Sequence, residues 1–156
     1  MDTIIIRKAT LEDLDILLRF EQGVIAAERP SDNTLQDGLI HYYDLKEMIT
    51  GRNIELVIAE LNQCIVGCGY ARIDNSKPFY RHKKHSYFGF MYVDPDHRGK
   101  GVNKKIIEAL QQWSISQNVT EMRLEVYNDN IPAIKAYEKV GFTKYIIEMR
   151  MDLNKE

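Results

Sequence analysis

A glycine-rich turn carries the strongest chemical signal in this 156-residue sequence. The segment reads Tyr92-Val93-Asp94-Pro95-Asp96-His97-Arg98-Gly99-Lys100-Gly101-Val102-Asn103. Apolar residues before Asp94 predict a strand, and the apolar spacing after Gly101 predicts a helix. The first amides of a helix have no acceptors inside it and their dipoles add, so an anion placed there receives several hydrogen bonds. The turn is therefore predicted to bind a phosphate or pyrophosphate group.

Two common nucleotide-binding motifs fit this turn poorly. The NTPase phosphate loop needs Ser or Thr directly after its lysine, whereas Gly101 follows Lys100. The dinucleotide fingerprint needs a third glycine where Lys104 stands. The tripeptide Gly99-Lys100-Gly101 is by itself a weak motif, because most such glycines only form a turn.

The wider turn resembles the pyrophosphate loop R-x-x-G-x-G/A of the GNAT N-acetyltransferases, with Arg98 and Gly101 at matching positions. Asn103 departs from the usual small residue. A second segment, from Leu124 to Phe142, resembles the strand, Asn, helix, Tyr and Gly-Phe signature of the same family. Two motifs at family spacing are far more specific than one, and the predicted element order agrees, so the resemblance covers nearly the whole chain.

The resemblance implies an α/β (α+β) fold in a single GNAT domain over residues 1–156. Its sheet is expected to be mixed and mostly antiparallel, with helices on both faces and the fourth and fifth strands splayed. Residue patterns predict strands at 3–9, 55–60, 64–73, 85–93, 121–127 and 142–153. They predict helices at 10–28, 44–50, 101–117 and 130–140.

The resemblance also implies acetyl-CoA as cosubstrate, with no metal. The backbone around Met91 is expected to pair with the pantetheine arm and to stabilise the oxyanion through an amide. Tyr137 matches the tyrosine that protonates the departing thiolate, although its spacing from Ile134 and Val140 equally fits a core ring. The expected coenzyme contacts are Met91, Tyr92, Val93, Arg98, Gly99, Lys100, Gly101, Val102, Asn103, Asn130 and Tyr137.

The identity of the general base stays open. An alkylammonium has a pKa of about 10, so some group must take its proton. Many family members use a Glu on the strand before the loop, but the corresponding stretch here, 87–91, contains none. The alternatives are Glu28, His41 and a water chain leading to bulk solvent. Glu28 equally fits a solvated helix end, and His41 a surface loop contact.

The resemblance implies that the loop between the first two predicted helices covers the acceptor side of the cleft. Acidic residues in and around this loop favour a cationic acceptor. They are Glu28, Asp32, Asp37 and Asp44. Tyr42 and Tyr43 could add cation–π contact.

Composition excludes other classes. A net charge of −2 argues against a general nucleic-acid binder, and the basic cluster at 81–85 is expected to be a solvated loop. No apolar run approaches the roughly 20 residues that span a bilayer, and the start lacks a signal-peptide pattern, so we expect a cytoplasmic protein.

The two cysteines, Cys64 and Cys68, are predicted to be reduced core thiols on one strand.

The expected function is acetyl-CoA-dependent N-acetylation of a primary amine on a small molecule or peptide. Direct attack in a ternary complex is favoured, because no Cys or Ser stands in a recognisable nucleophile set. The alternative is a non-catalytic acyl-CoA-binding sensor or interaction module. Exposed sheet edges are compatible with a homodimer.

Overall fold

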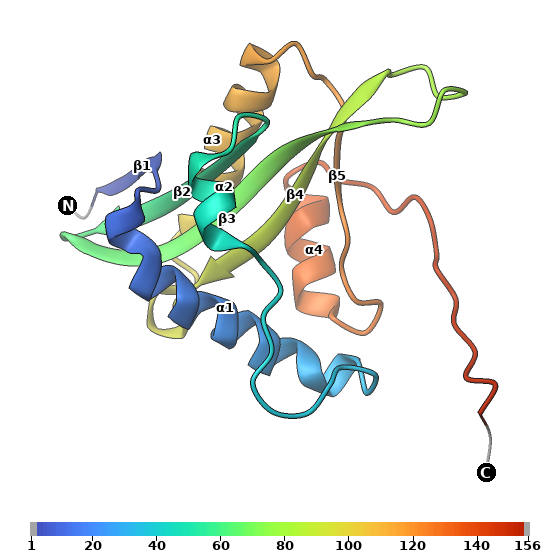
Figure 1. Ribbon diagram of the computed structural model, residues 1–156. Helices are drawn as coiled ribbons and strands as arrows, with labels where there is room; N and C mark the ends of the chain where they lie inside the picture. Colours follow the sequence, from blue (N-terminus) through green and yellow to red (C-terminus); the bar gives the residue numbers. More distant parts are fainter. Residues whose placement is uncertain (1–2, 155–156) are drawn as a thin grey trace. The chain divides into compact units, whose positions relative to one another are not determined.

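The computed structural model describes residues 3–154. The chain divides between Glu125 and Val126 into two compact units. The first unit contains a five-stranded sheet and the helices α1, α2 and α3, and the second contains α4 and the C-terminal segment (Figure 1). Each unit is described by itself.

The sheet of the first unit is mixed and mostly antiparallel. Neighbours pair antiparallel from β1 through β4, whereas β4 and β5 pair in parallel. The helices α1 and α2 lie in the connection between β1 and β2, a tight turn joins β2 to β3, and the crossover through α3 brings β5 alongside β4 in the parallel sense. This topology confirms the predicted sheet. In spatial order the strands are β1 (Ile4–Lys8), β2 (Ile54–Leu61), β3 (Cys64–Asn75), β4 (Lys84–Val93) and β5 (Met122–Leu124).

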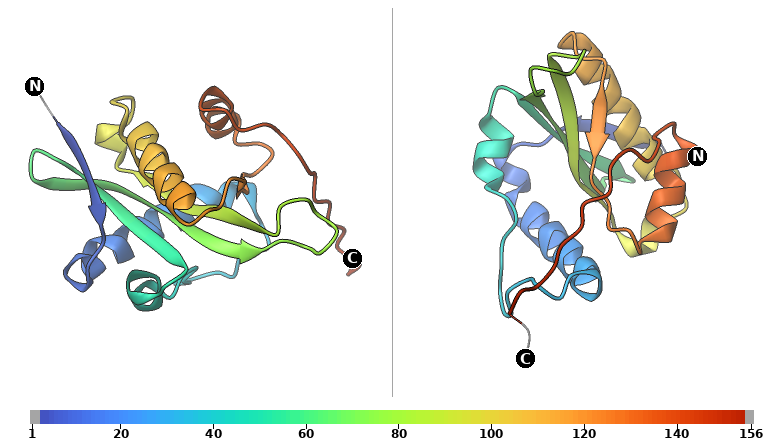
Figure 2. Two further views of the ribbon diagram at one scale, coloured as in Figure 1. Left: turned by 90° about the horizontal axis from the view of Figure 1, so that it is seen from above. Right: turned by 90° about the vertical axis from the view of Figure 1, so that its right-hand side faces the viewer.

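Helices cover both faces of this sheet, as predicted. The helices α1 (Leu14–Glu28) and α2 (Leu45–Thr50) lie on one face and α3 (Val102–Ser116) lies on the other (Figure 2). The core under α1 and α2 is a continuous apolar cluster. On the other face, a Cβ on Gly69 would lie 2.9 Å from Ile106 Cγ2, so the glycine allows α3 to pack closely.

Strand β4 carries a bulge at its centre. Cys68 is paired with Tyr92 and Tyr70 with Gly89, so β4 has one extra residue over this interval. Phe90, inside the bulge, is buried and has a φ of 52°, a backbone conformation that a bulky side chain rarely adopts. The Cys68 thiol donates a hydrogen bond to the Phe90 carbonyl over 3.5 Å.

Strands β4 and β5 separate after a short parallel pairing. Their last paired residues are Phe88 and Leu124. Beyond Phe88, β4 pairs with β3 along one edge only, which confirms the predicted splay. The strand predicted at 121–127 is correspondingly shorter and ends at Leu124.

The second unit contains α4 (Ile131–Lys139) followed by an irregular chain. The strand predicted at 142–153 is wrong, because no strand is present over these residues. Apolar side chains do alternate there, but the described part of this unit holds no other strand to complete a ladder. The alternating side chains are exposed: Tyr145, Ile147, Met149, Met151 and Leu153.

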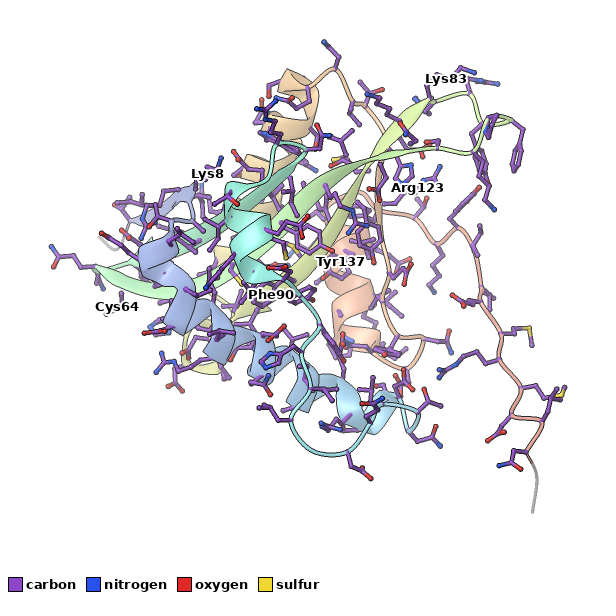
Figure 3. The ribbon with its side chains drawn as sticks, in the orientation of Figure 1. Lys8, Cys64, Lys83, Phe90, Arg123 and Tyr137 are labelled. Carbon is purple, nitrogen blue, oxygen red and sulfur yellow. The ribbon has the colours of Figure 1, made fainter. Side chains whose placement is uncertain are left out.

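The cysteines differ from each other in environment. Cys68 is fully buried and burial raises the pKa of its thiol, as expected for a core cysteine. The prediction is wrong for Cys64, which is exposed because it begins β3 directly after the turn from β2. Figure 3 labels Cys64 at this turn and Lys83 at the opposite end of the sheet, on the connection between β3 and β4.

The basic cluster at 81–85 covers the end of this connection and the first two residues of β4. Residues 81–84 are exposed, as expected for a solvated loop, and the ring of His85 lies 2.8 Å from the Ser76 hydroxyl. None of the described helices combines the length and apolarity needed to cross a bilayer.

Candidate active site

The turn between β4 and α3 depends on two glycines in the left-handed conformation. Gly99 has a φ of 77° and Gly101 a φ of 84°, and Gly101 is the N-cap of α3. A Cβ at either position would meet open space, so the backbone angle rather than crowding requires glycine. The first amides of α3, beginning at Val102, have no acceptors within the helix and are suited to an anion.

Hydrogen bonds fix this turn to the end of β4. The Arg98 Nε donates to the Val93 carbonyl over 3.1 Å. The Asp94 amide donates to Val66 on β3 over 2.8 Å, and the Asp94 carboxylate accepts from the Asp96 amide over 2.9 Å. Arg98 thus braces the turn, while Lys100 and the edge of the turn remain exposed.

The residues before the turn present an open backbone edge. The Tyr92 ring packs against Phe20 of α1, with centroids 4.8 Å apart, and lies so close to Gly23 that a Cβ there would come within 2.8 Å of it. The side chain of Tyr92 is therefore fixed against α1. The backbone of Met91 to Val93 has no β5 partner and, apart from the Val93 carbonyl that Arg98 occupies, is open to pairing with an extended ligand.

A buried carboxylate organises the loop between α1 and α2. Glu21 has no exposed surface. One carboxylate oxygen lies 2.7 Å from Nδ1 of His41. The other oxygen accepts the backbone amides of Tyr42 and Tyr43, each over 2.9 Å. The loop is thereby attached to α1 by three hydrogen bonds to one side chain.

The same loop lies against the bulge of β4. The ring of Tyr43 stacks on the ring of Phe90, labelled in Figure 3, with centroids 4.7 Å apart and an interplanar angle of 29°. His41 is two residues from Tyr43, so the structure brings this predicted base candidate close to the strand that is expected to hold the thioester.

Glu28 lies at the end of α1 and is half-buried. Its pKa is raised mainly by burial and further by the charge of Asp32, while a hydrogen bond with Tyr42 opposes the rise. Both base candidates thus lie next to Tyr42, Glu28 through this hydrogen bond and His41 as its chain neighbour.

Two cavities adjoin the loop between α1 and α2. One, of about 440 Å³, is lined by residues that include Tyr43, Tyr70, Asp44, Glu47 and Arg72. The other, of about 540 Å³, is bordered by residues that include His41, Leu14, Leu18 and Lys46. The acidic residue Asp44 lines both cavities. Its carboxylate also caps α2 by accepting from the Glu47 amide.

The other predicted acidic residues have different surroundings. Asp32 accepts from the Thr34 amide over 3.0 Å and stabilises a turn. Asp37 is exposed and lines neither cavity. Within residues 3–154, no group of His, Cys, Asp and Glu side chains is arranged to hold a metal ion.

Asn130 and Tyr137 belong to the second unit. The Asn130 side chain caps α4 by accepting from the Ala133 amide over 3.3 Å. Tyr137 is half-buried and its ring meets the edge of Phe142, with centroids 5.9 Å apart. The described residues of this unit include no buried side chain, so Tyr137 is not a core ring within it.

Sequence reasoning missed Glu21 and Phe90. Glu21 had a signal, because Leu17, Glu21 and Ile25 are spaced by four residues and all lie on the buried stripe of α1. A carboxylate on a buried stripe needs partners, and this one holds a loop. Phe90 had no such signal, since nothing in an apolar strand marks where the extra residue of a bulge falls.

Comparison with known proteins identifies the family. The profile described as Acetyltransferase (GNAT) family matches residues 21–142. The streptothricin acetyltransferase of Escherichia coli is 43% identical over 51 residues, 33% of this chain and 29% of that protein. The matched part spans between 21% and 37% of the length of the first three curated relatives.

Solved structures share the fold. A tetramutant protein from Bacillus halodurans has a TM-score of 0.86 at 21% identity, with 96% of this chain and 99% of that chain covered. A predicted acetyltransferase from Clostridium acetobutylicum, solved with acetyl-CoA, has a TM-score of 0.73 at 20% identity, with 97% of both chains covered. The left-handed glycine turn, the splayed strands and the family profile agree, and the chain belongs to the GNAT family of acetyltransferases.

Proposed function

We propose that this protein transfers the acetyl group of acetyl-CoA to an amine. The observation that carries the proposal is the open backbone edge of β4, from the bulge at Phe90 to Val93, leading directly into the glycine turn at the start of α3. An extended thioester with a pyrophosphate at one end matches both features, because the edge offers strand-like hydrogen bonds and the turn offers amides to an anion.

The residues present fit this cosubstrate. Gly99 and Gly101 leave the surface of the turn open, since even an added Cβ would meet no atom within 4 Å. The proposed coenzyme contacts are the backbone of Met91, Tyr92 and Val93 and the turn from Arg98 to Asn103. Asn130 and Tyr137 are further proposed contacts on the strength of their match to the family signature alone.

Each step of the transfer can be assigned to residues of this chain. A base removes one proton from the ammonium, and the freed lone pair forms the new C–N bond while a β4 amide near Met91 stabilises the charge on the carbonyl oxygen. The C–S bond then breaks, Tyr137 donates its phenolic proton to the thiolate, and the second amine proton returns through solvent to the Tyr137 phenolate. The products are an amide and CoA thiol, with no enzyme-bound acyl group.

The acceptor is proposed to be a primary amine on a small molecule or a peptide, preferably cationic. Asp44 and Glu47 at the cavity beside Tyr43 support a cationic acceptor by charge complementarity. A similar chain from Escherichia coli carries the name streptothricin acetyltransferase. The proposal extends to a cytoplasmic, single-domain protein that needs neither metal nor nucleic acid and can form a homodimer.

The test is turnover measured as thiol release from acetyl-CoA. The amine panel includes streptothricin, neamine, glucosamine 6-phosphate and a short peptide with a free N-terminus. Release that depends on both acetyl-CoA and an amine supports catalysis. Tight acetyl-CoA binding without release for any amine favours the alternative, a non-catalytic acyl-CoA sensor.

A further inference from the structure

We infer that His41 is the general base of the acetyl transfer and that Glu21 is its positioning residue. The inference rests on the proposed function and assigns the one step that the sequence left open. The pair consists of a fully buried carboxylate on α1 and an imidazole that is half-exposed, with 52% of its side-chain surface accessible.

The geometry around Glu21 determines which ring nitrogen of His41 carries the hydrogen. The carboxylate can only accept, and its Oε1 lies 2.7 Å from Nδ1, so Nδ1 carries the hydrogen and donates it. Nε2 is then the nitrogen with the lone pair. A base needs this tautomer with the lone pair directed away from its support, and the ring borders a cavity of about 540 Å³.

The second oxygen of Glu21 determines where the imidazole lies. It accepts the amides of Tyr42 and Tyr43, so it holds the backbone on the C-terminal side of His41. Tyr43 in turn stacks on Phe90 inside the β4 bulge. One buried carboxylate therefore fixes the tautomer of the imidazole and the position of its loop over the proposed thioester site.

Glu28 is the less suitable of the two candidates. Its carboxylate is engaged by Tyr42, and it lines neither cavity, whereas His41 borders one of them. Charged groups near His41 come from three elements: Glu21 of α1 contacts it, and Asp44 of the same loop and Lys46 of α2 line the same cavity. Glu21 contacts the ring directly, at 2.7 Å from Nδ1.

The proton balance of the step is simple. Nε2 of His41 accepts a proton from the acceptor ammonium, which gives an imidazolium held by the negative charge of Glu21, and the freed lone pair of the amine forms the C–N bond. The imidazolium then returns the proton to solvent, and the neutral ring with its hydrogen on Nδ1 is restored. The thiolate takes its proton from another donor, so His41 serves as a base only.

Glu21→Gln tests the positioning role with little change in shape. The amide oxygen can still accept from Tyr42 and Tyr43, but the amide nitrogen now donates to Nδ1 of His41 and forces the hydrogen onto Nε2. We expect kcat to fall about 100-fold, within the usual range for general base catalysis, while the KM for acetyl-CoA changes less than about twofold.

His41→Asn tests the base itself. The asparagine amide can keep the hydrogen bond to Glu21 and hold the loop, but it cannot accept a proton. Loss of about 100-fold or more in kcat is expected, while the KM for acetyl-CoA changes less than about twofold. Glu28→Gln tests the rival candidate: it is expected to retain kcat, and a loss of kcat equal to that of His41→Asn would assign the base to Glu28 instead.

A readout independent of turnover is the tautomer of His41, measured by long-range ¹H–¹⁵N NMR. The chain has four histidines, and His41→Asn assigns the signal. The neutral ring should carry hydrogen on Nδ1 in the native protein and on Nε2 in Glu21→Gln. Hydrogen on Nε2 in the native protein, or full kcat in His41→Asn, would overturn the inference. Absence of any acetyl-CoA binding by the native protein contradicts the proposed function instead.

Discussion

Tyr43 stacks on Phe90, with ring centroids 4.7 Å apart and planes inclined by 29°. Phe90 is the left-handed residue of the β4 bulge, and Tyr43 belongs to the loop that Glu21 holds. The contact thus joins the loop of the proposed acceptor side to the strand of the proposed coenzyme side. Burial raises the pKa of the Tyr43 phenol, so this ring stays neutral at physiological pH.

The coupling of these two rings can be measured by a double-mutant cycle. Tyr43→Leu and Phe90→Leu should each destabilise the fold, and the double variant should lose about 0.5–1.5 kcal/mol less than the sum, because an aromatic pair stabilises by that amount beyond its buried area. Urea unfolding of the four proteins gives the free energies. Strict additivity would show that the stacking contributes nothing.

Gly101→Ala should weaken acetyl-CoA binding. An L-residue in the left-handed conformation costs about 1–2 kcal/mol, and relaxation of this strain would reorient the first amides of α3. We expect lower stability and about tenfold weaker affinity, measured by calorimetric titration.

Gly38→Ala is the matched control, since Gly38 has a similar φ of 81° and also lies in open space, but on the loop after α1. It should lose stability and keep its affinity. Equal loss of affinity in the two variants would contradict the assignment of the turn.

Glu28 gives a pH-dependent stability. Burial raises its pKa above the ordinary value of 4.5, so the native state binds this proton more tightly than the unfolded state does. The stabilisation is complete below about pH 4.5 and is lost as the pH rises through the native pKa. The stability of Glu28→Gln relative to the unsubstituted protein, measured by urea unfolding, should therefore increase as the pH rises from 4 to 8. A constant difference across this range would contradict the raised pKa.

The two cysteines should react at different rates with a disulfide reagent. Cys64 is exposed, whereas Cys68 has no exposed surface and its thiol pKa is raised by burial. A thiolate is the reactive form, so one thiol per chain should react rapidly and the second only after unfolding. Cys64→Ser should abolish the rapid phase, and this variant also removes the background from thiol-release assays. Two rapid thiols in the native protein would contradict the burial of Cys68.

Much of the fold could be predicted, because the local patterns and the final structure agree. The glycine turn was visible since left-handed residues at a strand-to-helix junction favour glycine, here Gly99 and Gly101. Asp44 and Gly51 marked the ends of α2 through capping. The predicted strand at 142–153 failed because alternation gives an amphipathic pattern but does not supply a neighbouring strand.

The candidate site was only partly visible from the sequence. His41 could be named as a base candidate by its chemistry, but its carboxylate partner lies 20 residues away and is identified only when α1 and the loop pack together. The bulge at Phe90 depends on a register shift between β3 and β4, which tertiary pairing sets. Local composition carries no information on either relationship.

Acetyl-CoA binding tests the account most directly. Thermal unfolding with acetyl-CoA, CoA and NAD as comparison ligands reports it, because a ligand that binds only the native state raises Tm. Tm is expected to increase clearly with acetyl-CoA and CoA and not with NAD, and to increase less in Gly101→Ala than in Gly38→Ala. No increase with acetyl-CoA at millimolar concentration would contradict the proposed coenzyme site, and with it both the transferase and the sensor function.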